Sequence, residues 1–265
     1  MSGFVLPKRL NAGQDQKGGT PMLRPLFMRI FALAALPIIV GHECVAADGA
    51  SALEKMPRDL EVRFALSALP PILRAEASVY VLDPQKGYVL DHKGTNSQTC
   101  FVERTEWQRE DYSDDVYTPL CFDKAGMESH GKVWFDVAEM RAQGVPPETV
   151  KKTVEKRFND STYGPPERAG VSYMIAPLIR GYSSFDFTKK DKHTHVLPHV
   201  MYYAPNVTDA DFGGIRPPSP FPFIRQQGPQ GNFIQHLGEK ETEEILKSES
   251  KLLKDLCAYR SYLCL

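Results

Sequence analysis

Short apolar runs, each bounded by Pro, Gly, Asp or Asn, mark the strands of this chain. The first two runs, residues 77–82 and 87–91, flank an Asp83-Pro84 turn signal and predict a hairpin. Residues 99–104 follow as a third strand, so we expect the three to form an antiparallel meander. Later runs predict strands at residues 170–176 and 199–203 and a final hairpin at residues 221–225 and 232–237.

Helices are indicated where apolar residues recur every three or four positions. The predicted helices cover residues 48–73, 134–143, 147–158 and 239–262. A capping box of Ser51 and Glu54 starts the first helix, and Pro146-Pro147 starts the third. The last helix is amphipathic and has glutamates in its first turns, where the helix dipole favours negative charge. The polar residues 105–127 and 181–196 are predicted to be loops.

This order of elements predicts an α+β fold, in which a mainly antiparallel sheet packs against several helices and a C-terminal amphipathic helix closes the chain. The contents of 42% hydrophobic and 25% charged residues are typical of a globular protein. We expect two parts. Residues 1–47 form an upstream extension and a signal peptide, and residues 48–265 form a single α+β domain that is long enough for one sizeable core.

The export prediction depends on a short apolar segment near the N-terminus. Residues 30–40 carry no charge, follow two arginines and precede Val45-Ala46-Ala47, which fits the small-x-small pattern of a cleavage site. An 11-residue helix spans roughly 16 Å, about half a bilayer core, so it is too short to cross a membrane. We expect cleavage after Ala47 and export to the periplasm or the extracellular space. Translation from Met22 instead of Met1 would bring Arg24 close to the N-terminus, as a signal peptide requires.

Charge argues against one class of partner. The chain has 32 basic and 33 acidic residues, and residues 1–47 hold five of the basic and two of the acidic ones. The mature part therefore keeps 27 basic and 31 acidic residues, a net charge of −4. A nucleic-acid binder usually has a basic excess, so we expect no nucleic-acid partner.

After residue 47 no run approaches 18 apolar residues, so no transmembrane segment is expected after cleavage.

Cysteine usage predicts disulfide bonds. After cleavage removes Cys44, four cysteines remain, and an even number in an exported chain favours bridges. Three pairings are possible, of which closeness in sequence favours Cys100–Cys121 and Cys257–Cys264. The first would close a loop of about 20 residues, worth roughly 3 kcal/mol. An intact helix would hold the second pair roughly 10.5 Å apart, beyond the usual limit of about 7 Å. Either the last helical turn unwinds, or these two cysteines pair elsewhere.

His193, His195 and His199 form the best candidate for chemistry. Two histidines at i and i+2 share one face of an extended segment, and His199 could add a third nitrogen ligand for zinc or copper. No complete metal motif such as H-E-x-x-H accompanies them. The alternative is a polar, histidine-rich loop, with His199 hydrogen-bonded in the core. No other cofactor is evident from the sequence.

Other signatures of activity are incomplete. The sequence contains no serine-hydrolase elbow, dinucleotide-binding glycine motif or Walker sequence. Asp111, Asp114 and Asp115 could bind Ca²⁺ or form a solvated acidic loop, since the EF-hand spacing is missing. Tyr202 and Tyr203 could line an aromatic groove for a carbohydrate or peptide, or they could pack in the core.

Five pieces within residues 79–206 are distinctive, at residues 100–104, 119–123, 140–144, 170–174 and 198–205. Through these pieces about half of the chain resembles an uncharacterised family of exported bacterial proteins. The most distinctive piece is Pro-His-x-Met-x-Tyr-Ala-Pro, which runs from Pro198 to Pro205. The resemblance implies no activity, because none is established for the family. The positions of His193 and His195 do not recur in its pattern, which leaves His199 as the most interesting histidine.

The sequence therefore predicts an exported protein of unknown biochemical function, with a binding or structural role as the default. The alternative is a periplasmic metal-dependent hydrolase that uses the histidine cluster, and whether the protein is an enzyme stays open. A common site would require Glu103, Arg104, His199 and Tyr203 to converge on one concave pocket.

Overall fold

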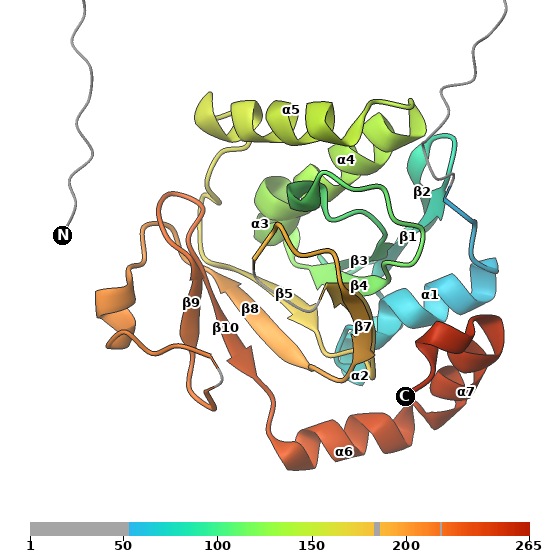
Figure 1. The fold of residues 1–265 in the computed structure, drawn as a ribbon. Coiled ribbons are helices and arrows are strands. Elements are labelled where there is room, and N and C mark those ends of the chain that lie inside the picture. The colour runs from blue at the N-terminus through green and yellow to red at the C-terminus, as the bar shows by residue number, and fades with distance from the viewer. Residues whose placement is uncertain (1–52, 183–185, 218) are drawn as a thin grey trace, which may run out of the picture. The chain divides into compact units, whose positions relative to one another are not determined.

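An eight-stranded sheet forms the centre of the described residues, which are 53–182, 186–217 and 219–265 of this computed structural model. Its strand order is β2-β1-β3-β4-β5-β8-β10-β9, and every neighbouring pair is antiparallel except β1 with β3 (Figure 1). The strands are β1 (Ser78–Asp83), β2 (Gly87–His92), β3 (Thr99–Glu103), β4 (Thr118–Phe122), β5 (Gly170–Met174), β8 (His199–Tyr203), β9 (Phe223–Gln226) and β10 (Asn232–His236). The predicted α+β class is confirmed.

The N-terminal segment precedes the first described residue. The contacts divide the chain into Met1–Ala46 and Ala47–Leu265. The predicted signal peptide, with Cys44, the cleavage point after Ala47 and the cap residue Ser51, lies outside the described residues. Within the described part, no helix has the length and apolar character needed to cross a membrane.

Helices cover both faces of the sheet. They are α1 (Arg58–Ser67), α2 (Pro71–Arg74), α3 (Lys124–Gly126), α4 (Lys132–Ala142), α5 (Pro147–Asn159), α6 (Glu239–Ser248) and α7 (Ser250–Tyr259). The first helix begins later than predicted, because residues 53–57 are not helical and α1 starts after Pro57. Proline disfavours the helical conformation of the residue before it, which explains this boundary.

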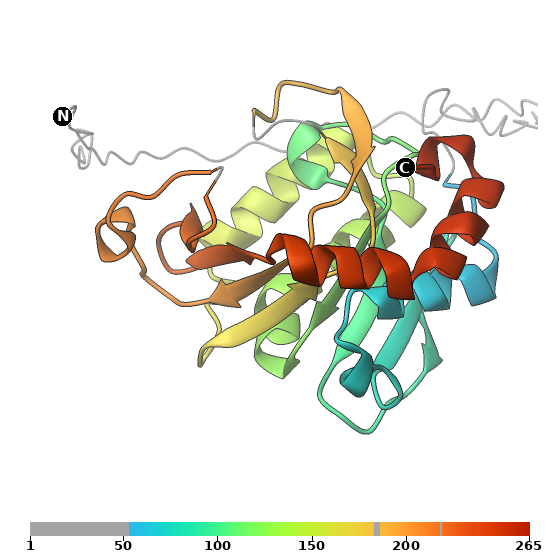
Figure 2. The same ribbon diagram turned by 90° about the horizontal axis from the view of Figure 1, so that it is seen from below.

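Alternation along β3 separates two layers of the core. Cys100 and Val102 point to one face, where they pack with residues of α1 and α7 such as Phe64 and Leu256. Phe101 points to the opposite face, where it packs with aromatic residues of α4 and neighbouring strands. Figure 1 shows α4 and α5 on one side of the sheet, and Figure 2 shows α1 and α7 side by side on the other.

The predicted antiparallel meander is wrong in its third strand. β1 and β2 form the expected hairpin, but β3 pairs in parallel with the other edge of β1. The connection crosses tightly over the start of β1, where the amides of Thr95 and Asn96 both donate to the Glu76 carbonyl. A Cβ at Gly94 would lie 2.0 Å from that same oxygen, so only glycine fits this crossover.

Two predicted loops contain strands. β4 lies inside residues 105–127 and pairs with β3 along its whole length, although Pro119 and many acidic neighbours hide its pattern. Residues 181–196 contain β7 (Lys192–His195), which pairs with β6 (Ile179–Tyr182) in a separate two-stranded sheet. Polar and acidic residues surround β4 and make up β7, so the sequence pattern does not reveal that these strands pair with β3 and β6.

The predicted C-terminal helix is interrupted and unwound at its end. It consists of α6 and α7, which meet at Glu249, and the Glu249 carboxylate pairs with Arg74. Helix α7 ends at Tyr259 and Arg260 is extended. A 3₁₀ turn over Ser261–Leu263 then returns the chain, so that the Cα atoms of the disulfide pair Cys257–Cys264 are 4.4 Å apart. The last turn has unwound, as this pairing requires.

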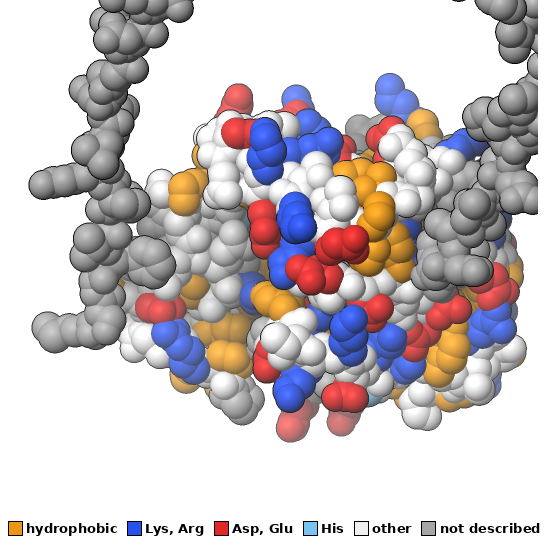
Figure 3. All heavy atoms as spheres, turned by 45° about the horizontal axis from the view of Figure 1, so that its top comes forward, with side chains coloured by type: hydrophobic (Ala, Val, Ile, Leu, Met, Phe, Trp, Pro, Cys, Tyr) orange, Lys and Arg blue, Asp and Glu red, His pale blue; other side chains and the backbone are white. Residues whose placement is uncertain are grey.

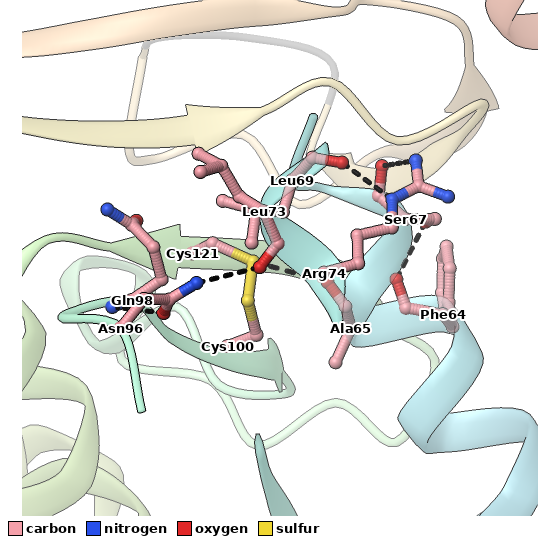
Figure 4. The surroundings of a disulfide bond; sticks show 10 residues. All are labelled: Phe64, Ala65, Ser67, Leu69, Leu73, Arg74, Asn96, Gln98, Cys100 and Cys121. Carbon is pink, nitrogen blue, oxygen red and sulfur yellow. Dashed lines mark hydrogen bonds between the residues drawn. A yellow bond between two sulfur atoms is a disulfide. The ribbon is translucent and has the colours of Figure 1, made fainter. Parts of the chain in front are cut away.

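The second disulfide bond joins two central strands. Cys100 and Cys121 are register partners on β3 and β4, and neither is exposed. Figure 4 shows the bond beside α1, and the sulfur atom of Cys121 lies 3.4 Å from the carbonyl oxygen of Ala65 on that helix. Asn96 donates a hydrogen bond of 2.8 Å to the Leu73 carbonyl close by, which ties the crossover to the end of α2. Both disulfides are thus the pairs that sequence proximity favoured.

A buried carboxyl on α1 makes stability depend on pH. Glu61 is 1% exposed, and its Oε1 accepts a hydrogen bond of 2.7 Å from the Leu82 amide. Among the described residues its Oε2 has no hydrogen-bond partner. Burial raises the pKa of Glu61 from 4.5 to about 7, against smaller lowering effects of the Leu82 amide and Arg104.

We expect Glu61→Gln to stabilise the protein at about pH 8 by up to about 3 kcal/mol and to have little effect near pH 4. Above its ordinary pKa, Glu61 releases its proton in the unfolded chain but retains it in the folded protein, so stability falls as pH rises towards about 7. Glutamine keeps the acceptor for Leu82 and never ionises. Urea unfolding at both pH values measures the difference, and an equal gain at both would contradict the role of ionisation.

Candidate functional site

A cavity of about 590 Å³ opens beside the β8–β10–β9 part of the sheet. Its walls combine aromatic rings with amide side chains, and both tryptophans of the chain belong to them. The lining residues are Trp107, Gln108, His130, Val133, Trp134, Glu155, Phe158, Asn159, Phe187, Met201, Tyr203, Arg225, Gln226 and Asn232. The volume lies within the range of about 300–1,000 Å³ that small-molecule sites occupy.

The sheet supplies one wall of the cavity. Met201 and Tyr203 lie two residues apart on β8, so they share a face, and Asn232 is the register partner of Tyr203 on β10. The Tyr203 hydroxyl donates to the Ser172 hydroxyl on β5 at 3.1 Å, which fixes the ring. Burial raises the pKa of Tyr203, so the phenol stays protonated.

A π-helical segment brings a histidine against the sheet wall of the cavity. Met127–Gly131 joins α3 to α4 as a π-helix, a rare form that often marks functional sites. Within it, the His130 ring stacks on Tyr203 with centroids 3.9 Å apart. Burial lowers the pKa of His130 to about 4, so the imidazole is neutral at pH 7. Its Nε2 lies 3.3 Å from the Gln230 carbonyl, which can only accept, so Nε2 carries the proton.

Two amide oxygens in the cavity wall lack hydrogen-bond donors. Asn232 is 5% exposed, and its Oδ1 has no partner among the described residues. Gln108 has a buried Oε1 that is likewise without a donor in that part of the chain. An unpaired buried acceptor costs about 1–3 kcal/mol. Both oxygens expose less than 1 Å², so their cost falls on the folded protein itself.

Formal charges in the lining balance. Glu155 and Arg225 contribute one negative and one positive charge, and His130 is neutral. On the face shown in Figure 3, acidic and basic side chains are also intermixed and form no patch of one sign. Neither the lining nor this face therefore selects an ion of one charge.

The residues that a common site would have required do not converge. Tyr203 lines the cavity, but Glu103, Arg104 and His199 are absent from its described lining. Arg104 instead donates to backbone carbonyls of the β3–β4 connection. Glu103 is buried on β3, where burial and then the charge of Glu106 raise its pKa.

The candidate metal ligands separate into two groups. His193 and His195 lie on one face of β7 with ring centroids 4.4 Å apart, as their i, i+2 spacing predicts. His199 starts β8, where it is buried against His236, and its Nδ1 lies 2.7 Å from the Leu197 carbonyl. In the part of the chain that the structure describes, no three His, Cys, Asp or Glu side chains are grouped to hold a metal ion. A zinc or copper site at these histidines stays a prediction.

The predicted aromatic groove divides between two faces of the sheet. Tyr202 points away from Tyr203 and stacks on Phe233 at 5.0 Å, on the face opposite the cavity.

The acidic loop also has a different arrangement from a calcium site. Asp115 pairs with Arg180 and Lys192, which connects this loop to the β6–β7 sheet.

Sequence reasoning missed most of the cavity. Trp107 and His130 fall in or beside the segment predicted as a loop, and Trp134 and Asn232 were assigned only as a helix residue and a strand residue. The one available signal was the presence of just two tryptophans in the chain, which did not reveal that they would meet.

No protein-family model, curated protein or solved structure matches this chain.

Proposed function

We propose that this chain is an exported protein that binds a small molecule in the cavity. The observation that carries the proposal is a cavity of about 590 Å³ whose walls bring both tryptophans of the chain together with four amide side chains and the neutral His130. The π-helix that carries His130 supports the same conclusion.

Export is supported by the bonding of the cysteines. All four cysteines of the described residues form disulfides, and such bonds persist mainly in oxidising compartments. The predicted signal peptide would take the chain there. The proposal therefore combines a periplasmic or extracellular location with ligand binding.

The position of the tryptophans provides a direct assay. Because Trp107 and Trp134 both line the cavity and are the only tryptophans of the chain, a ligand that enters should change the tryptophan emission. We expect a saturable change for at least one class in a screen of neutral saccharides, nucleosides, short peptides and the neutral apolar probe N-phenyl-1-naphthylamine. Thermal-shift measurements on the same compounds provide an independent reading.

A pair of variants on β8 tests the location. Met201→Phe places a ring in the cavity and should weaken binding at least about ten-fold, or about 1.4 kcal/mol. Val200→Phe adds the same ring to the opposite face of the same strand, as alternation requires, and should leave the affinity unchanged. Calorimetric titration gives both affinities. Equal weakening by the two variants would contradict binding in the cavity. If no compound class binds, the proposed function is contradicted.

A further inference from the structure

We propose that the ligand is an amphiphile whose hydrocarbon chain fills the interior of the cavity while its polar head stays at the mouth. This inference rests on the proposed function, because it names the chemical class that the same cavity takes. Four properties of the lining support it: its apolar side chains, the bonding of its interior polar groups, the composition of its mouth and the arrangement of its rings.

Apolar side chains of the lining remain partly accessible between two clusters of the core. Trp107 and Phe158 pack against the buried cluster of α4 and α5, whereas Trp134 and Met201 pack against the cluster on the sheet. These four side chains and that of Phe187 line the cavity, and each is half-buried. Covering apolar surface that water would otherwise contact is favourable in proportion to the area covered. A hydrocarbon chain between the two clusters therefore gains affinity from the wall.

Polar groups of the interior are already bonded within the protein or are out of reach. His130 has partners at 3.1 and 3.3 Å on its two ring nitrogens, and the Tyr203 hydroxyl is hydrogen-bonded to β5. The unpaired oxygens of Gln108 and Asn232 each expose less than 1 Å². A ligand that depends on hydrogen bonds would thus lose its bonds with water and find few replacements. A hydrocarbon chain has no such bonds to lose.

The mouth of the cavity has a different composition. The exposed residues of the lining are all polar, namely Glu155, Asn159, Arg225 and Gln226. Exposed lining residues lie where the cavity meets solvent, so charges of both signs and two amides surround the opening. A polar head can stay hydrated there while the chain is inside.

The rings of the wall favour a flexible chain over a flat ring system. Trp107 and Phe158 are tilted by 34° with their centroids 6.2 Å apart, and His130 and Tyr203 are already in contact at 3.9 Å. Neither pair leaves a parallel-sided slot for a planar molecule. Met201 has an unbranched, adaptable side chain, which suits a ligand without a fixed shape.

The experiment titrates the full mature chain with hexyl, octyl and decyl glucoside below their critical micelle concentrations. Tryptophan emission and calorimetry give the affinities. Each added pair of methylenes should tighten binding at least about ten-fold, because burying one methylene is worth about four-fold. Decyl maltoside, which changes only the head, should agree with decyl glucoside within about three-fold. Calorimetry at two temperatures should show the negative heat-capacity change of apolar burial, whereas glucose and maltose should not bind.

Variants on β8 test the place of the chain. Met201→Gln keeps the length of the side chain but puts an amide in the apolar interior, so it should weaken decyl glucoside at least about five-fold. Met201→Leu keeps the wall apolar and should stay within about two-fold of the parent. Val200→Gln is the matched control, because alternation directs Val200 to the other face of the strand. It should leave the affinity unchanged.

Other results would overturn the inference in distinguishable ways. If the three glucosides bind equally, or if glucose binds as tightly as they do, the chain is not what the cavity recognises. If a saccharide, nucleoside or peptide binds and no alkyl glucoside does, the ligand class is wrong while the binding function stands. If nothing binds, the proposed function fails as well. Equal weakening by Met201→Gln and Val200→Gln would place the chain outside the cavity.

Discussion

Replacing Arg104 with methionine is expected to lower the free energy of unfolding by about 4 kcal/mol. The Arg104 side chain is 1% exposed and donates 2.7 Å hydrogen bonds to the carbonyls of Val116 and Asp114 and a 3.3 Å bond to that of Glu54. Its guanidinium also lies 3.8 Å above the Tyr117 ring. Methionine fills similar space but leaves these carbonyls without donors, at about 1–3 kcal/mol for each buried group, and removes the cation–π contact.

The same substitution should also weaken ligand binding. Arg104 holds the β3–β4 connection at Asp114 and Val116, and this connection carries Trp107 and Gln108 of the cavity wall. Urea unfolding measures the stability, and calorimetric titration measures the affinity. Arg58→Met is the control, because the Arg58 side chain is 68% exposed and its ion pair with Asp91 is at the surface, so its loss should cost below about 1 kcal/mol. If Arg104→Met costs no more than the control, Arg104 does not hold the β3–β4 connection in place.

The second large effect concerns the disulfide between β3 and β4. Combined Cys100→Ala and Cys121→Ala substitutions are expected to lower the free energy of unfolding by about 4 kcal/mol. About 3 kcal/mol reflects the loop that the bond closes across a sequence separation of 21 residues. The remainder reflects the loss of two sulfur atoms from a fully buried part of the core. Denaturant unfolding without reductant measures the change.

The matched control removes the other disulfide. Combined Cys257→Ala and Cys264→Ala substitutions should cost less, about 2 kcal/mol, because that bond spans only seven residues next to the C-terminus. Adding reductant to the parent protein should approach the sum of the two losses. If the two double variants were equally unstable, loop length would not explain the contribution of the first bond.

Local patterns predicted those parts of the fold whose burial follows from neighbours in sequence. The stripe of Val150 and Val154 is fully buried on α5, and the strand predicted at residues 199–203 is β8 with the same bounds. Periodicity reports which side chains are buried, so it succeeds for such elements. It cannot report strand partners. The parallel pairing of β3 with β1 depends on a crossover at Gly94, and the pattern of β4 is masked by Pro119 and its acidic surroundings.

The cavity could not be predicted for the same reason. Its members come from separate elements, and only Tyr203 was among the residues considered for a site. Trp107 lies in the β3–β4 connection, His130 in the π-helix and Asn232 on the last strand. Their approach follows from pairing between β8 and β10 and from packing of α4 on the sheet. No local spacing encodes these contacts.

The strand order has a consequence for how the chain assembles as it emerges with its N-terminus first. All seven neighbouring pairs join strands no more than three places apart in the chain, with β3 added beside β1 and β4 beside β3. Each new strand of the sheet except β9, which waits for β10, therefore finds its docking edge already present, and local pairings of this kind form quickly. Oxidation of Cys100 with Cys121 needs only the first half of the chain, so vectorial folding can lock the N-terminal strands while the cavity-forming strands β8 and β10 are still to come.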